Sequence, residues 1–392
     1  MTLTQIAAPL EVPEAGLLRA ITVLQVVPAL VTGGVERGTV DVAGAISAAR
    51  GIPVVASSGG PMVRELERLG ARHVQMPLDR KTPWAIRANA RRLAELIESL
   101  DADIVHARSR APAWSAYSAA RSTRRPFVTT FHATYNFKTG LKRWYNSVMA
   151  RGDRVIAISN HIADHILKNY AVNPDHIRVI PRGIDVDVFD PTRMTTERLM
   201  ALSQSWRLPD GVPLVILPGR VSRWKGHGVL VDALAMLGRR DLHCLFVGSD
   251  QGADKYKQEV SAQIEARGLS GQVRFVGDCR DMAAAYMLAD VVVAPSTDPE
   301  GFGRVAAEAG AMGRPMIAAN HGGARETVVP GETGWLTTPG DAADLAGAIE
   351  AALDMDSDSR SILAANARAH VAANFSKGAM TAATLAVYHE LL

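Results

Sequence analysis

The chain has 392 residues, a net charge of +3, and 47% hydrophobic against 21% charged residues. This length exceeds what one hydrophobic core usually organises, so we expect two domains. The composition excludes a disordered chain and a coiled coil, and no run of 18 apolar residues predicts a membrane-spanning helix. Cys244 and Cys279 have neither metal-site spacing nor the number of a disulfide scaffold. Because residues 1–16 also lack the basic cluster of a signal peptide, we expect a cytoplasmic enzyme.

Basic residues are concentrated in the first half of the sequence. Residues 1–190 carry 24 Lys and Arg against 17 Asp and Glu, whereas residues 191–392 carry 19 against 23. A basic half predicts an anionic partner, either a membrane surface or a phosphorylated acceptor. A peripheral position on the inner face of the cytoplasmic membrane is compatible with this charge. Nucleic acid is not expected, since the basic residues follow no binding motif and are not interleaved with aromatic residues.

Strand-like and helix-like segments alternate along the chain, which predicts parallel sheets covered by helices. Many strand-like segments are continuous runs of Val, Ile and Leu, as in a sheet that is buried on both faces. Strands are expected at 20–27, 53–57, 73–76, 103–107, 127–131, 154–158 and 177–180, and then at 213–217, 243–248, 272–276, 290–294, 315–319 and 334–336.

The segments between these strands have the periodicity of helices. Helices are expected at 35–50, 62–69, 84–100, 114–121, 160–169, 195–206, 228–237, 254–267, 282–288, 303–312, 342–353 and 359–373, with a last helix within 375–392. We therefore predict an α/β protein with two doubly wound, Rossmann-like domains. Because ligands bind outside the carboxyl ends of such strands, the expected active site is a cleft between the domains.

The segment 136–145 mixes cations with aromatic residues. One interpretation is an amphipathic segment that contacts a membrane. The other is a solvated helix whose apolar side lies in the core, and the sequence leaves both open.

The most informative stretch is Glu300-Gly-Phe302-Gly303-Arg304, followed by Glu308. It reads as the loop and first turns of a helix after a buried strand. The free N–H groups and the dipole of a helix start suit a phosphate. Two carboxylates flanking that position accept hydrogen bonds from hydroxyls on either side of it. This layout fits a sugar nucleotide, although Glu308 is also compatible with a solvated helix residue.

Four further motifs follow predicted strands. They are the glycine pair Gly33-Gly34, the pair Phe131-His132, residues 181–185 (Pro-Arg-Gly-Ile-Asp), and residues 219–226, which contain Gly219, Arg220, Ser222 and Lys225. Paired glycines let the backbone approach a ligand closely. Arg220 and Lys225 are the cations that suit a phosphate, although a basic surface loop is the simpler interpretation.

Taken in chain order, with the glutamate motif last, the five motifs resemble those of the retaining glycosyltransferases of family 4, whose two Rossmann-like domains form the GT-B architecture. The resemblance covers nearly the whole chain and points to bacterial cell-envelope and lipopolysaccharide glycosyltransferases. It implies an acceptor-side domain at 1–188 that includes the terminal helix 375–392, and a donor-binding domain at 189–374. The donor would be a UDP- or GDP-type sugar, and the acceptor a glycan or a lipid-linked glycan. No protein-bound cofactor or metal is expected.

The resemblance also implies roles for single residues. Arg220 and Lys225 would hold the donor diphosphate, in the loop that carries Gly219 and Ser222. Glu300 would bind the donor sugar, Glu308 the ribose, and the main chain of Phe302, Gly303 and Arg304 the sugar and distal phosphate. Val276 and Gly277 would border the base. Gly33 and Gly34 would lie over the diphosphate, and His132 would face the sugar–phosphate junction. The alternative for His132 is a structural role, as a hydrogen-bonded histidine at the end of a strand. Arg182, in the motif at residues 181–185, is also compatible with a structural role.

Other functions fit the sequence less well. A dinucleotide-dependent oxidoreductase needs a Gly-x-Gly-x-x-Gly motif, and Gly33-Gly34 with Gly38 has the wrong spacing. A Walker-type loop is absent from residues 219–226. A GT-B protein without transferase activity, such as a nucleotide-sugar epimerase, remains the main alternative.

Overall fold

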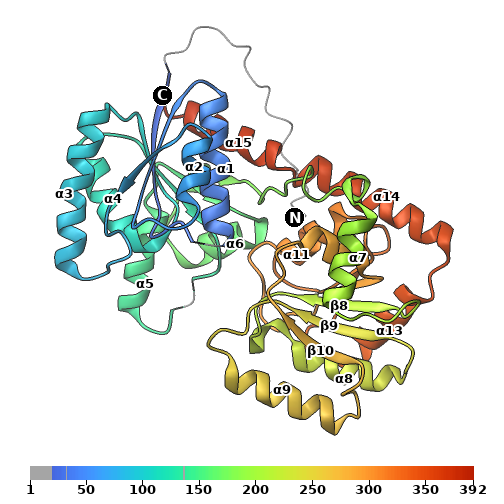
Figure 1. Cartoon of the computed structure of the whole chain (residues 1–392). Coiled ribbons are helices and arrows are strands. Elements are labelled where there is room, and N and C mark those ends of the chain that lie inside the picture. Colours follow the sequence, from blue (N-terminus) through green and yellow to red (C-terminus); the bar gives the residue numbers. More distant parts are fainter. Residues whose placement is uncertain (1–19, 32, 136) are drawn as a thin grey trace. The chain divides into compact units, whose positions relative to one another are not determined.

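The computed structural model describes residues 20–31, 33–135 and 137–392 (Figure 1). The chain divides into two compact units. Unit 1 runs to Gly183 and resumes at Lys377–Leu392, and unit 2 is Ile184–Ser376. The sequence predicts domain boundaries after residues 188 and 374, which lie a few residues from the observed boundaries at Gly183 and Ser376.

Unit 1 is built on a seven-stranded parallel sheet with the order β3-β2-β1-β4-β5-β6-β7. In the centre of this sheet, Leu24 pairs with Val54 on one side and Val105 on the other. All three are fully buried, which explains why the strands are continuous apolar runs. The strands are β1 (Thr22–Val26), β2 (Ile52–Ser57), β3 (Arg72–Gln75), β4 (Ile104–Ala107), β5 (Phe127–Phe131), β6 (Arg154–Ala157) and β7 (Ile177–Val179).

Helices cover both faces of this sheet (Figure 1). Local signals set where several of them begin. The Ser159 side chain accepts a hydrogen bond from Ile162 N and so caps the helix that begins at residue 160. Thr82 caps the helix that begins with Pro83, a residue that favours the first helical position. The helices are α1 (Gly34–Ala48), α2 (Val63–Arg68), α3 (Pro83–Leu100), α4 (Arg110–Ser122), α5 (Gly140–Asn146), α6 (Asn160–Asn169) and α15 (Lys377–His389).

The terminal helix α15 packs against α1 in unit 1. Val387 and Tyr388 belong to the same buried cluster as Val23 and Ile46. The residue after the helix end, Glu390, accepts hydrogen bonds from two arginines of the sheet, so polar contacts also fix this end.

Unit 2 contains a six-stranded parallel sheet with the order β10-β9-β8-β11-β12-β13. Its core joins the central strands to two helices, with Phe246, Leu230 and Leu345 in one buried cluster. The strands are β8 (Leu214–Pro218), β9 (His243–Val247), β10 (Val273–Gly277), β11 (Val291–Ala294), β12 (Met316–Ala319) and β13 (Trp335–Thr337).

The helices of unit 2 precede, alternate with and follow these strands in sequence, and they cover the sheet (Figure 1). They are α7 (Thr196–Ser205), α8 (His227–Leu237), α9 (Asp254–Ala266), α10 (Met282–Leu288), α11 (Arg304–Ala311), α12 (Ala324–Thr327), α13 (Ala342–Leu353) and α14 (Ser357–Asn374). Two all-parallel sheets with covering helices confirm the predicted α/β, doubly wound fold class.

The segment 136–145, which the sequence leaves open between two interpretations, contains most of helix α5 (Gly140–Asn146). Asn136 lies outside the described residues. Leu141 is 76% exposed and Trp144 is 54% exposed. Trp144 stacks on Trp114 with 4.7 Å between the ring centroids. The apolar side of α5 is therefore not buried in the core. Across the described ranges, no helix has both the length and the hydropathy needed to cross a membrane.

Candidate active site

The strand order of the unit 2 sheet reverses between β8 and β11: strands β8 to β10 extend the sheet to one side, and β11 to β13 extend it to the other. In open α/β sheets, ligands bind outside the carboxyl ends of the strands at such a point. Two of the predicted motifs follow these two strands: the loop with Arg220 and Lys225 follows β8, and the loop with Glu300 follows β11. The fold therefore brings both motifs to one edge of one sheet.

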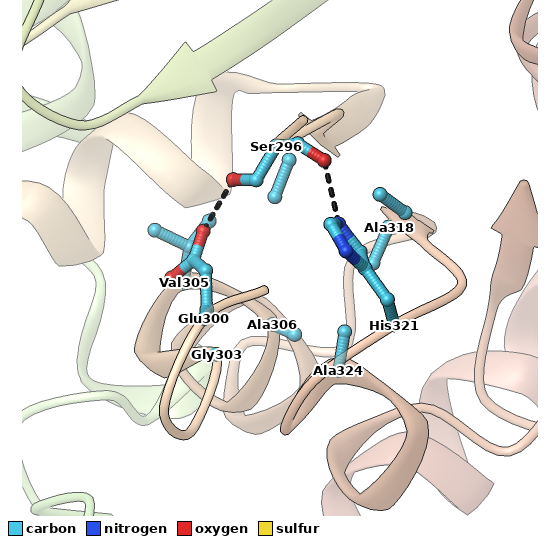
Figure 2. Close-up of a pocket in the computed structure, with 10 residues that line it drawn as sticks. Ser296, Glu300, Gly303, Val305, Ala306, Ala318, His321 and Ala324 are labelled. Atoms are coloured by element: carbon cyan, nitrogen blue, oxygen red, sulfur yellow. Dashed lines mark hydrogen bonds between the residues drawn. The ribbon is translucent and has the colours of Figure 1, made fainter. Parts of the chain in front are cut away.

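Lys225 and Glu300 are directly bonded at this edge. Lys225 Nζ donates to Glu300 Oε1 at 2.8 Å. Ser296 Oγ donates to the same oxygen at 2.6 Å, as Figure 2 shows. The Lys225 and Glu300 side chains are only 12% and 16% exposed, so salt screens this pair little. The main chain adds a further link, since Thr297 N donates to Trp224 O at 2.7 Å. The two loops thus form one rigid platform.

Glycines allow the first loop to follow its path. Gly219 has a φ of +138°, and a Cβ there would lie 3.3 Å from Lys225 Cε. Gly226 has a φ of +76°, and a Cβ there would lie 2.0 Å from the carbonyl oxygen of Pro295. A side chain at Gly226 would push the β8 loop away from the β11 loop, which would separate Lys225 from Glu300.

Arg220 is exposed, and within the described residues its guanidinium forms no hydrogen bond or ion pair. Its main-chain oxygen accepts a hydrogen bond from Ser222 Oγ at 3.4 Å. The oxygen of Ser222 in turn accepts from Lys225 N at 3.0 Å. The guanidinium of Arg220 is therefore available to a ligand, whereas its backbone is held in the same turn as Lys225.

Val276 and Gly277 end strand β10, at the same edge of the sheet as the β8 loop. Gly277 has a φ of +73°, and its oxygen accepts a hydrogen bond from Gly248 N at 2.8 Å. A Cβ at Gly248 would lie 2.2 Å from the oxygen of Gly219. The ends of β8, β9 and β10 are thus packed backbone against backbone.

The helix α11 begins directly after Gly303, which has a φ of +86° and no side-chain cap. Glu308, one turn into the helix, is only 8% exposed and is therefore not the solvated residue of the simpler interpretation. Tyr286 donates to Glu308 Oε2 at 2.8 Å, and Arg304 Nε donates to Glu308 Oε1 at 2.5 Å. Burial, followed by the Glu308 charge, raises the pKa of Tyr286 well above its usual range, so Tyr286 remains a donor. The sequence analysis missed Tyr286, because its position in α10 gives no local signal of this contact.

A second glycine-rich loop, after β12, supports the loop that carries Glu300. Gly323 N donates to Glu300 O at 2.8 Å, and a Cβ at Gly322 would lie 2.5 Å from that same oxygen. His321 is bonded through Nε2 to the oxygen of Ser296 at 2.7 Å (Figure 2). The sequence analysis missed this loop, although the pair Gly322-Gly323 after a strand was an available signal.

A narrow pocket opens between these loops and the start of α11, as Figure 2 shows. Most of its walls are small side chains, and its polar side chains carry one hydroxyl, one carboxylate and one imidazole. Its lining residues are Ala294, Ser296, Glu300, Gly303, Val305, Ala306, Ala318, Ala319, His321 and Ala324.

Unit 1 holds a separate group of predicted residues, at the carboxyl ends of its own strands. Arg182, after β7, donates through Nη2 to His132 Nδ1 at 2.9 Å and through Nη1 to the oxygen of Gly34. Gly33, with a φ of +149°, precedes the first turn of α1. Arg108, after β4, lies against the same helix, because a Cβ at Gly38 would meet its Nη2 at 2.8 Å. The sequence analysis missed Arg108.

The surroundings of His132 disfavour a charged ring. Burial is the largest cause that holds its pKa well below the usual range, and Arg182, Arg108 and His106 add to the effect. Arg108 itself is only 4% exposed. We therefore expect His132 to be neutral at physiological pH.

Within the described ranges, no three His, Cys, Asp or Glu side chains form a group that could hold a metal ion.

Two family models match the chain, described as "Glycosyltransferase Family 4" over residues 32–188 and "Glycosyl transferases group 1" over residues 201–370. A curated relative, the D-inositol 3-phosphate glycosyltransferase of Xylanimonas cellulosilytica, is 32% identical over 304 residues, which are 73% of this chain and 71% of the relative. The chain belongs to glycosyltransferase family 4. It is a glycosyltransferase, and the oxidoreductase alternative is without support.

Other relatives of this glycosyltransferase match over shorter spans. The D-inositol 3-phosphate glycosyltransferase of Corynebacterium diphtheriae is 37% identical over 235 residues, which are 57% of this chain and 52% of the relative. That match therefore spans about half of each protein.

Solved structures resemble the glycosyltransferase over almost its full length. A glycosyltransferase from Rickettsia africae ESF-5 is 39% identical, with a TM-score of 0.89 over 95% of this chain and 99% of that one. Anabaena HepE, solved with UDP-glucose, is 26% identical, with a TM-score of 0.80 over 95% and 99% of the two chains. WaaG, a glycosyltransferase involved in lipopolysaccharide biosynthesis, is 18% identical with a TM-score of 0.71 over 93% and 99% and shares the fold. The family and the GT-B architecture are thereby confirmed.

Proposed function

We propose that the protein transfers a sugar, with retention of configuration, from a nucleoside-diphosphate sugar to a hydroxyl of a glycan or lipid-linked acceptor. The observation that carries this proposal is the joined platform of Lys225, Ser296 and Glu300 beside the uncapped start of α11. A cation, a carboxylate and free main-chain N–H groups are the partners that a diphosphate and a sugar need.

Arg220 and Lys225 hold the donor diphosphate in this proposal. When the bond from the sugar C1 to the phosphate breaks, negative charge grows on the leaving diphosphate. A guanidinium fork and an ammonium placed there stabilise the transition state more than the ground state. The partial burial of Lys225 strengthens its attraction to the leaving group.

The two carboxylates bind hydroxyls at opposite ends of the diphosphate. Glu300 accepts from the donor sugar, and Glu308 accepts from the ribose. Main-chain N–H groups of Phe302, Gly303 and Arg304 contact the sugar and the distal phosphate. This is supported by the orientation of Glu308, which Tyr286 fixes by its hydrogen bond.

The rest of the nucleotide lies along the ends of β8, β9 and β10 in this proposal. Gly219 and Ser222 border the diphosphate, and Val276 and Gly277 border the base. The absence of a Cβ at Gly219 and Gly277, both with positive φ, supports a close approach of the ligand to the main chain.

Unit 1 supplies the acceptor side in this proposal. Gly33 and Gly34 line the diphosphate and the acceptor, and His132 contacts the sugar near its reacting carbon. Their position at the carboxyl ends of β1 and β5 supports a ligand-binding role. The acceptor hydroxyl attacks the face from which the diphosphate leaves, and the departing phosphate takes its proton. The enzyme needs no protein-bound cofactor or metal for these steps.

The relatives suggest the classes of donor and acceptor. A UDP-sugar is supported by HepE, which was solved with UDP-glucose. For the acceptor we favour an intermediate of lipopolysaccharide or surface-polysaccharide synthesis. A phosphorylated inositol is the second candidate, because the curated relatives carry the name D-inositol 3-phosphate glycosyltransferase.

We also propose that α5 brings unit 1 to an anionic membrane surface. Leu141 and Trp144 are exposed apolar residues, and Lys142 and Arg143 beside them are exposed cations. Apolar residues that enter the headgroup region together with cations that meet anionic lipids are typical of interfacial helices.

The function is tested by incubating the protein with UDP- and GDP-sugars and a panel of acceptors, among them lipopolysaccharide core fragments and inositol phosphate. We expect release of nucleoside diphosphate only when donor and acceptor are both present. The anomeric coupling constant of the product, measured by NMR, should equal that of the donor configuration. An inverted product would contradict retention, and release of nucleotide without any transfer would contradict transferase activity on these acceptors.

A further inference from the structure

Arg182 connects the ends of three strands in unit 1. It follows β7, donates to the ring of His132 after β5, and donates to the oxygen of Gly34 after β1. It therefore contacts two of the residues that the proposed function places at the acceptor side. The bond to the His132 ring constrains the protonation of that ring.

The chemistry of the two groups determines where the ring proton lies. A guanidinium has only donors and keeps its charge under all conditions in which proteins fold. His132 Nδ1, at 2.9 Å from Arg182 Nη2, must therefore accept the hydrogen bond. A neutral ring whose Nδ1 accepts carries its single proton on Nε2.

We propose that Arg182 is a positioning residue that fixes His132 as the neutral Nε2–H tautomer, so that the ring presents an N–H donor to a substrate oxygen. Nε2 is buried, and no residue in the described ranges has the geometry of a hydrogen bond to it. The main chain of Arg108 is near enough to favour the protonated ring slightly, but it does not meet that geometry. A substrate oxygen would satisfy this donor.

The charges around the ring favour the same state. Burial acts most strongly, and the groups that face His132 from the neighbouring strand ends, Arg182, Arg108 and His106, all disfavour a second proton. His132 therefore acts as a hydrogen-bond donor and is a poor proton acceptor. This inference rests on the proposed function for the identity of the substrate, and it agrees with a reaction in which the departing phosphate takes the acceptor proton.

The tautomer is measured by NMR on protein with 15N-labelled histidine, without any substrate. The His132 signals are assigned by their loss in His132→Gln. In the wild type we expect the Nε2–H pattern throughout the pH range in which the protein is folded. In Arg182→Gln the ring should titrate at a higher pH and populate both tautomers. An unchanged pattern in Arg182→Gln would overturn the proposal.

Two further variants separate positioning from folding. Arg178→Gln removes another arginine of the same unit, one that is bonded to Glu390, and should leave the His132 signals unchanged. Arg182→Lys keeps the charge but loses the fork that holds both partners. In this variant the ring should stay neutral but populate both the Nε2–H and the Nδ1–H tautomers. Arg182→Lys also serves as the test if Arg182→Gln does not fold. A fixed Nε2–H pattern in Arg182→Lys would contradict the role of the fork.

Kinetics give an independent readout. The dependence of kcat/KM on pH in the wild type should show no acid limb from His132 near neutral pH. In Arg182→Gln, kcat/KM should fall at pH values where the ring is neutral, because part of the population then carries its proton on Nδ1 and has no donor at Nε2. An unchanged profile would contradict the proposal. If no donor and acceptor react, the proposed function fails, whereas the NMR result still decides the tautomer.

Discussion

Lys225 and Glu300 bind each other across two loops that are 75 residues apart in sequence. Both loops follow central strands of unit 2, and the Lys225 side chain is only 12% exposed. A donor diphosphate recruits Lys225 in our account, so Lys225→Ala should lower kcat about 10²- to 10³-fold, the usual loss for one transition-state donor. Steady-state kinetics with a saturating donor measure this effect.

The matched control is Lys257→Ala. Lys257 is also an ion-paired lysine of unit 2, but it contacts Asp250 and is 38% exposed. Its removal should leave kcat within about twofold of the wild type. Equal rates for Lys225→Ala and Lys257→Ala would remove Lys225 from the site.

Tyr286 orients Glu308, so Tyr286→Phe should weaken nucleotide binding. The variant loses the donor at Glu308 Oε2 and leaves a buried carboxylate oxygen without its partner, at a cost of about 1–3 kcal/mol. We expect the Kd for UDP to rise at least several-fold in isothermal titration calorimetry, with a smaller effect on kcat. Tyr117→Phe in unit 1 is the control, and an unchanged Kd in Tyr286→Phe would show that Glu308 does not depend on this bond.

Gly322 keeps the loop after β12 pressed against Glu300. A Cβ at Gly322 would lie 2.5 Å from Glu300 O, whereas a Cβ at Gly331 has open space. Both residues have positive φ, +59° and +79°, so alanine brings similar backbone strain to both. Gly322→Ala should therefore lower both Tm and donor affinity, and Gly331→Ala should lower only Tm, by a smaller amount. Thermal unfolding with and without UDP measures both, and equal effects of the two substitutions would contradict the packing argument.

His227 makes the stability of unit 2 depend on pH. The ring is fully buried among aromatic residues, and burial, aided by the charge of Lys225, lowers its pKa to about 4. In the unfolded chain the pKa is about 6.5, so the unfolded state binds more protons between these two values. Stability should therefore fall as the pH drops from about 6.5 towards 4, by up to about 1.4 kcal/mol per pH unit from this residue.

Urea unfolding of the wild type and of His227→Phe at pH 7.5 and 5.5 tests this dependence. The variant should lose about 1 kcal/mol less on acidification than the wild type, because phenylalanine does not titrate. Identical losses would show that His227 is not the group responsible.

The surface of α5 should mediate binding to anionic vesicles. The double variant Leu141→Ala/Lys142→Gln removes an exposed leucine and its neighbouring lysine, and should lower sedimentation with vesicles of anionic phospholipid. The same change on α6, Leu167→Ala/Lys168→Gln, removes an equivalent pair, of which Leu167 is 44% exposed, and should have little effect. Equal losses, or no binding of the wild type at low salt, would contradict a specific role of α5.

The central strands were predictable because parallel strands buried on both faces are continuous apolar runs, and the edge strands β3 and β7 are the more polar exceptions. All lie within two residues of their predicted bounds, as β5 and β11 illustrate. The helix α12 was not predictable, because Ala324–Thr327 is a single turn with no periodicity to detect. The exposed side of α5 was equally undetermined, since its pattern fits both a core-facing and a solvent-facing helix.

The candidate site was predictable where its chemistry lies within one short motif. Lys225, Glu300 and Glu308 belong to such motifs. Tyr286 and Arg108 were not predictable, because their importance comes from contacts between strand ends and helices that only the fold brings together. No pairing rule within a single sequence indicates such long-range hydrogen bonds.

The most direct test of the central claim is a crystal structure of the protein soaked with UDP. We predict that the diphosphate lies beside Lys225 and the first turn of α11, with the ribose hydroxyls on Glu308 and the Lys225–Glu300 bond opened or shared. UDP bound elsewhere on the molecule, with Lys225 and Glu308 untouched, would contradict the claim that this edge of unit 2 holds the activated sugar.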